Sequence, residues 1–151
     1  MEDIKRTPMK TGGIECAKES DFEFVDGIIK KYKGGDKEIR IPEEIHGKAV
    51  RRLETNWESG PAWSPKFTGR RNSWHCVESI HLPSSLESIG DYCFYECRSL
   101  RSVEFASDIH LKSIGEGAFD DCPILRMVKI SRNFGFKDRF PKSVRFEVIS
   151  S

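Results

Sequence analysis

Hydrophobic and polar residues alternate in three short stretches of the chain that recur at nearly constant spacing. Ile80-His81-Leu82, Val103-Glu104-Phe105 and Val128-Lys129-Ile130 each place a polar residue between two apolar ones. Such alternation is typical of a β-strand with one buried side and one side that faces solvent. The step between equivalent positions is 23 residues from 82 to 105 and 25 residues from 105 to 130. The pattern therefore predicts strands that belong to a repeat.

The segments between these strands repeat as well. LESIGDYCFYEC at 86–97 and LKSIGEGAFDDC at 111–122 share Leu, Ser, Ile, Gly, a small residue, Phe and Cys at identical offsets. The glycine after each Ser-Ile pair can adopt backbone angles that are closed to other residues, and the residues after it suit a short helical turn. One unit cannot bury its apolar side alone. We therefore expect the units to stack as a solenoid with parallel strands.

Partial units flank the two good copies. Upstream, IRIP at 39–42 is similar to IHLP at 80–83, and Trp74 stands where the later units carry Cys. Downstream, PKSV at 141–144 is similar to PSSL at 83–86 before the pattern is lost. The last stretch is rich in aromatic residues, which we expect to cover the final unit as capping units do in repeat proteins. They are Phe134, Phe136, Phe140 and Phe146.

The two good copies, at 86–105 and 111–130, resemble the BspA-type leucine-rich repeat, whose units read approximately L-x-S-I-G-x-x-A-F-x-x-C-x-x-L-x-x-V-x-I-P. The resemblance covers about 22–53 and 74–131, and FEFVDGIIKKY at 22–32 is similar to the hairpin that opens such arrays. It implies an α/β-type repeat solenoid that is rich in β-structure. The implied array has about four parallel rungs (a rung is one unit of the stack), an N-terminal β-hairpin cap and an irregular C-terminal cap.

Domain boundaries follow from the same alignment. A flexible N-terminal segment is expected at 1–20 and a single leucine-rich repeat domain at 21–151. Within the domain we expect an insert loop at 54–73, the best repeats at 74–96, 97–121 and 122–131, and the C-terminal cap at 132–151.

The resemblance also implies a class of function, because members of this family mostly serve as protein-interaction or adhesion modules. We therefore expect a non-catalytic module that binds an unidentified protein partner. The competing hypothesis is a structural repeat fragment whose exposed ends self-associate into a homo-oligomer. The 25 Lys and Arg residues against 24 Asp and Glu leave a net charge of +1, which excludes partners attracted by global charge.

The sequence says less about the cellular location of the protein than about its fold. No run of about 18 apolar residues is present, so no membrane-spanning helix is expected. The N-terminus alternates charges and does not read as a secretory signal. These features predict a cytoplasmic protein by default, although the family that the chain resembles is often secreted or found on the cell surface.

The first candidate binding residues form a column on the outward side of the strands. Alternation places four polar side chains at one register, and Ser79, Ser102 and Met127 at the register two residues earlier. Strand faces of leucine-rich repeat proteins generally bind protein ligands, so we interpret the column as a candidate interface. The alternative is a solvated ladder of ion pairs, each worth about 0.2–1 kcal/mol. The four residues are Arg40, His81, Glu104 and Lys129.

The second candidate is the insert, where a loop rich in Trp, Pro, Gly and Arg replaces the usual turn. Trp and Arg are enriched at binding hot spots, so the insert predicts a protein-binding loop. Weak nucleic-acid or carbohydrate binding through 57–74 is a more distant alternative, because a few cations on a near-neutral protein give low affinity for nucleic acid. Trp74 itself is expected in the core. The candidate binding residues are Trp63, Lys66, Arg70 and Arg71.

The five cysteines do not point to catalysis. Cys97 and Cys122 share one register and are expected as buried thiols, with a zinc site or a disulfide as weaker alternatives. Cys16 and Cys76 fall outside the register and are the more reactive thiols. No phosphate-binding loop, dinucleotide fingerprint, zinc-protease motif or nucleophile elbow occurs. The sequence thus predicts a protein that is not an enzyme and has no metal and no cofactor.

Overall fold

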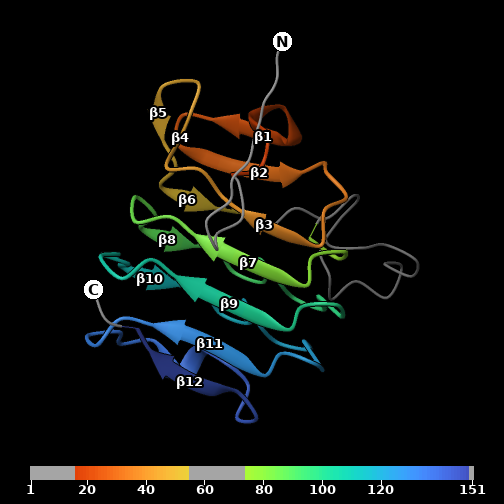
Figure 1. Ribbon diagram of the computed structural model, residues 1–151, viewed down its shortest axis with the longest axis vertical. Helices are drawn as coiled ribbons and strands as arrows, with labels where there is room; N and C mark the ends of the chain where they lie inside the picture. Colours follow the sequence, from red (N-terminus) through yellow and green to blue (C-terminus); the bar gives the residue numbers. More distant parts are fainter. Residues whose placement is uncertain (1–15, 55–73, 150–151) are drawn as a thin grey trace.

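The computed structural model describes residues 16–54 and 74–149, and its strands follow one another along the long axis (Figure 1). The first sheet has five strands in the spatial order β12 (Arg145–Val148), β11 (Met127–Ile130), β9 (Ser102–Phe105), β7 (Ser79–Leu82) and β3 (Glu38–Arg40). The second has five in the order β1 (Phe22–Val25), β2 (Ile28–Tyr32), β6 (Arg52–Leu53), β8 (Ser88–Ile89) and β10 (Ser113–Ile114). A third pairs β4 (Glu44–Ile45) with β5 (Lys48–Ala49), and two 3-10 helices, η2 (Glu19–Asp21) and η3 (Lys137–Arg139), complete the described elements.

The alternation of the sequence accounts for the first sheet, in which all neighbouring strands are parallel. Ile80, Val103 and Val128 lie in register and are each 0% exposed, whereas the residues on either side of them face outward. In the second sheet, β1 and β2 are antiparallel and the other neighbours are parallel. The apolar residues of both sheets form one core. The prediction of a β-rich repeat fold with parallel strands is confirmed.

The prediction of a short helical turn after β8 is wrong, because the chain forms consecutive hydrogen-bonded turns there instead. The N–H groups of residues 93, 95 and 97 donate to the carbonyl three residues earlier at 3.1–3.3 Å. Those of Tyr92, Phe94 and Glu96 donate to carbonyls of the next unit at 2.8–3.0 Å. Tyr92 and Glu96 have φ of 57° and 58°, a left-handed conformation that interrupts any helix. The α part of the expected α/β architecture is therefore absent from the described residues.

Glycine is needed after β10 for space rather than for backbone freedom. Gly90 and Gly115 are not among the residues with positive φ, contrary to the expectation for these positions. A Cβ built on Gly115 would collide with the main chain of Gly90 and Asp91 in the preceding unit. Stacked units approach each other so closely here that only a hydrogen fits.

Aromatic rings form a continuous column through the core. Trp74, 1% exposed, stacks on Tyr32 at 5.3 Å between ring centroids and packs against Phe94 at 5.3 Å, so its expected place in the core is confirmed. The column continues from Phe94 to Phe119 at 5.1 Å and to Phe140 at 4.4 Å. Phe140 in turn contacts two further aromatic residues of the C-terminal stretch, Phe134 and Phe146. Each of these units thus contributes one ring that contacts a ring of the next unit.

The last strand corrects the alignment of the C-terminal residues. PKSV at 141–144 precedes a strand, whereas its expected counterpart, 83–86, follows one. Strand β12 pairs with β11 so that Phe146 lies opposite Val128. Pro141 lies five residues before Phe146, whereas Cys122 lies six before Val128. This deletion of one residue hides the register when the unit is read from sequence alone.

Residues 16–21, most of which were expected in the flexible N-terminal segment, contact the repeat domain. Cys16 forms a parallel bridge with Arg40, and the N–H of Ala17 donates to the carbonyl of Arg40 at 2.8 Å. Cys16 and Ala17 therefore pair with the outer edge of β3.

Candidate functional site

The outward column of the first sheet forms as the alternation predicts. Arg40 lies opposite His81, His81 opposite Glu104, and Glu104 opposite Lys129, one residue from each of β3, β7, β9 and β11. Strand β12 adds Glu147 opposite Lys129, a residue that the sequence pattern did not reveal because the last unit is shorter. We call these five residues the charged ladder.

Charges alternate along the ladder and are partly withdrawn from water. His81 Nδ1 lies 3.4 Å from Glu104 Oε1, and the two side chains are 21% and 36% exposed. Burial lowers the pKa of His81 below its usual 6.5, and the neighbouring cations Arg40 and Lys129 act in the same direction, against Glu104. The imidazole is therefore neutral at pH 7. The ladder then carries two cations and two carboxylates, so its net charge is close to zero, as is that of the whole chain.

A second outward column runs beside the ladder. Ser79 lies opposite Ser102, and Ser102 opposite Met127, as expected. The Ser102 hydroxyl donates to the Ser79 hydroxyl at 3.0 Å, so the two side chains are held by each other. The face therefore offers fixed hydroxyls next to fixed charges, a surface that suits hydrogen bonding to a polar partner.

A cavity of about 260 Å³ lies at the end of the ladder. It brings the exposed residue Cys16 close to three ladder residues, which is an arrangement that the sequence spacing did not reveal. Its lining consists of Cys16, Arg40, Ile41, Glu43, His81, Leu82, Pro83, Glu104 and Ala106.

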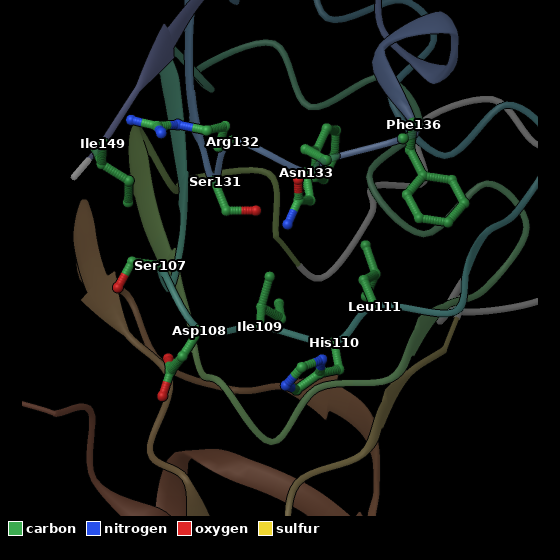
Figure 2. Close-up of a pocket in the computed structure, with 12 residues that line it drawn as sticks. Ser107, Asp108, Ile109, His110, Leu111, Ser131, Arg132, Asn133, Phe136 and Ile149 are labelled. Carbon is green, nitrogen blue, oxygen red and sulfur yellow. The ribbon is translucent and has the colours of Figure 1, made fainter. Parts of the chain in front are cut away.

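A larger cavity of about 570 Å³ lies between the loops that follow β9 and β11 (Figure 2). None of its polar residues was among the binding candidates that the sequence indicated. The available signal was the length of the loop at 106–110, which is two residues longer than 83–85. Its lining consists of residues 107–111, residues 131–136 and Ile149.

The four candidate residues of the insert, Trp63, Lys66, Arg70 and Arg71, lie outside the described residues, and their role stays a prediction. Trp74, at the end of the insert, is fully buried against Phe94 and Tyr32. Its ring is therefore buried in the core and does not form part of a binding surface.

The cysteines divide as the register predicts. Cys93, Cys97 and Cys122 are buried, Cys16 and Cys76 are exposed, and all five are free thiols. Burial raises the pKa of Cys122 to about 12 and that of Cys97 well above its usual value. The Cys122 thiol donates to the carbonyl of Phe94 at 3.2 Å and thereby joins two units. In the part of the chain that the structure describes, no group of three His, Cys, Asp or Glu residues is placed to hold a metal ion.

Comparison with known proteins gives one family model and two solved structures that are similar to this chain. Residues 72–139 match the family model described as "BspA type Leucine rich repeat region (6 copies)". A leucine-rich repeat protein of T. pallidum has 19% identity and a TM-score of 0.39, over 76% of this chain and 71% of its own. A leucine-rich cell surface protein of Faecalibacterium prausnitzii has 18% identity and a TM-score of 0.49, over 87% of this chain and 44% of its own. No curated protein matches the chain. Among the described residues, no helix is long and apolar enough to span a membrane.

Proposed function

We propose that this protein is a non-catalytic protein-interaction or adhesion module, because its residues 72–139 match the family model of BspA-type leucine-rich repeats. We assign the array about four rungs, with the hairpin of β1 and β2 as its N-terminal cap and residues 132–151 as its C-terminal cap. The fold supports this assignment through the aromatic column, in which Phe22 and Phe140 lie at opposite ends.

The observation that carries the proposal is the charged ladder. Its residues come from five neighbouring parallel strands, so their spacing is set by the sheet and costs little entropy to hold. A row of alternating charges attracts no partner at long range, because its net charge is close to zero. It discriminates at contact, where each charge must meet its complement. Such a surface favours recognition of an extended polar segment of another protein.

Panning of a displayed random-peptide library on the immobilised protein tests the proposal. We expect peptides whose binding is lost when Lys129→Glu and Arg40→Glu reverse the two cations of the ladder. The matched control is Lys112→Glu, because the Lys112 side chain is 73% exposed next to the second sheet. Peptides that bind both the ladder variants and the control variant as well as the unchanged protein would contradict the proposal.

Self-association is the second candidate function, and the open edges of the sheets favour it. Strands β12 and β1 are edge strands, and Val148 and Val25 at these edges are each 54% exposed. Unpaired edge strands can add a strand from another copy. Light scattering with increasing protein concentration tests this role. A mass that rises with concentration and returns to the monomer value in Val148→Lys would support it, whereas a constant monomer mass would exclude it.

A further inference from the structure

The same four-residue turn follows three neighbouring strands of the first sheet. In each turn the N–H of the fourth residue donates to the carbonyl of the first: Leu86 to Pro83 at 3.1 Å, Ile109 to Ala106 at 3.1 Å, and Phe134 to Ser131 at 3.2 Å. Each turn begins directly after its strand, and the strands are in register. The three turns are therefore structural equivalents, and differences between them reflect what each one contacts.

The first turn holds a carboxylate from the preceding unit. The N–H groups of Ser84 and Ser85 donate to the two carboxylate oxygens of Glu43 at 2.9 and 3.0 Å, and the Ser84 hydroxyl donates to the same carboxylate at 2.9 Å. Burial raises the pKa of Glu43, but these hydrogen bonds outweigh burial and lower the pKa below its usual 4.5. The turn thus provides two adjacent N–H groups that bind a carboxylate.

The third turn has the equivalent donors but no carboxylate of the described chain to meet them. Its second and third residues are Arg132 and Asn133, and among the described residues no acceptor is hydrogen-bonded to either N–H. Glu43 lies two positions after Ile41, and its counterpart beside this turn, two positions after Phe105, is Ser107. A serine side chain is too short and carries no charge. The cavity of about 570 Å³ lies between Ser107 and these two residues.

The walls of this cavity suit a small acidic group. In Figure 2 the Ser131 hydroxyl and the Asn133 amide point into the hollow from one wall, and the Ile109 and Leu111 side chains point into it from the facing wall, with the His110 ring at its lower edge. Arg132 extends along the first wall towards Ile149 and adds a positive charge. Asp108 at the opposite edge is the one carboxylate among the lining residues. The cavity volume lies within the range of about 300–1,000 Å³ that is usual for ligand sites.

We propose that this cavity, which we call the turn pocket, binds a carboxylate group on an acidic segment of a partner protein, in the position that Glu43 takes at the first turn. The N–H groups of Arg132 and Asn133 donate to the carboxylate oxygens, the Ser131 and Asn133 side chains lie beside it, and the Arg132 guanidinium adds a positive charge at the rim of the pocket. This assignment rests on the proposed protein-interaction function and specifies a second point of contact, at the carboxyl ends of the strands that carry the ladder.

NMR titration of the ¹⁵N-labelled chain with two blocked tripeptides tests the site. Acetyl-Gly-Glu-Gly-amide carries one carboxylate, and acetyl-Gly-Gln-Gly-amide is its uncharged match. We expect saturable shifts of the Arg132 and Asn133 amide signals with the Glu peptide, with a dissociation constant on the order of 10 mM, since one side chain contributes only a few contacts. The Gln peptide should leave both signals in place. Equal shifts with both peptides, or none with either, would overturn the assignment.

Variants give an independent readout. Ser107→Glu supplies the missing carboxylate in cis, so the amide signals of Arg132 and Asn133 should move before any peptide is added and then stop responding; Ser107→Gln is its uncharged control. Arg132→Gln should weaken binding several-fold, whereas Lys142→Gln, which removes an exposed cation elsewhere, should not. Ser107→Glu that binds the Glu peptide as strongly as the unchanged protein would refute the site. If Ser107→Glu does not fold, undiminished binding of the Glu peptide by Arg132→Gln would refute it.

The two proposals fail separately. If panned peptides still depend on Lys129 while the tripeptides produce no shifts, the turn pocket assignment falls and the protein-interaction function stands. If the tripeptides bind but no panned peptide depends on the ladder, the pocket stands and the ladder loses its role.

Discussion

Replacing Phe119 by alanine tests the repeat register at its most sensitive point. The side chain is 0% exposed and its ring stacks between Phe94, at 5.1 Å and 13° between ring planes, and Phe140, at 4.4 Å and 25°. Truncation of a buried phenylalanine costs about 3–5 kcal/mol because it removes apolar contact and leaves a cavity. Here two stacked partners lose a neighbour, and each aromatic pair contributes about 0.5–1.5 kcal/mol. We therefore expect a loss in the upper part of that range.

Equilibrium unfolding in urea, followed by circular dichroism, measures this loss. The midpoint should fall while the slope of the free energy of unfolding against urea stays the same, since the substitution changes little the area that unfolding exposes. Phe136→Ala is the matched control. Its ring is half-buried and meets Phe134 edge-on at 5.7 Å, so we expect a clearly smaller loss. A loss below about 1 kcal/mol for Phe119→Ala would refute the packing described here, because a fully enclosed ring cannot be removed so cheaply.

Three further outcomes follow from the structure. Gly115→Ala should cost about 1–3 kcal/mol in the same assay, because its Cβ meets the main chain of the preceding unit, whereas Gly35→Ala, with open space around it, should change stability by less than about 0.5 kcal/mol. The pKa of Glu43 is lowered in the folded protein, so its stabilising effect is present above pH 4.5 and is lost as the pH falls through the folded value; Glu43→Gln should flatten the fall in stability between about pH 5 and pH 3. Alkylation of the native protein, read by mass spectrometry, should modify Cys16 and Cys76 quickly and the three buried thiols only after unfolding; early modification of a buried thiol would contradict the core described here.

The strands of the first sheet and their outward residues could be placed correctly from the sequence for a physical reason. Alternation with period two shows which side of a strand is buried, and the 23- and 25-residue steps show which strands are equivalent. Both signals are local or strictly repeated, so the amino-acid order alone aligns Arg40, His81, Glu104 and Lys129. Trp74 could be assigned to the core in the same way, because it occupies a repeat position.

Other features depend on contacts that the repeat pattern does not encode. The turns after β8 avoid the helical form because alternate N–H groups bond to the next unit, and Gly115 is needed because a neighbouring backbone occupies its Cβ position. Strand β12 was misaligned since its unit is one residue shorter, which concealed Glu147.

By itself, then, the sequence determined the repeat, the strand register and the outward polar column, because periodic burial leaves a periodic record in the residues. Only the tertiary structure decided where two separate loops meet. The Glu43 carboxylate reaches a turn 41 residues further along the chain, and the turn pocket lies between the loops after β9 and β11. These contacts between loops depend on how the units stack against one another, so the residue pattern of a single repeat unit does not predict them.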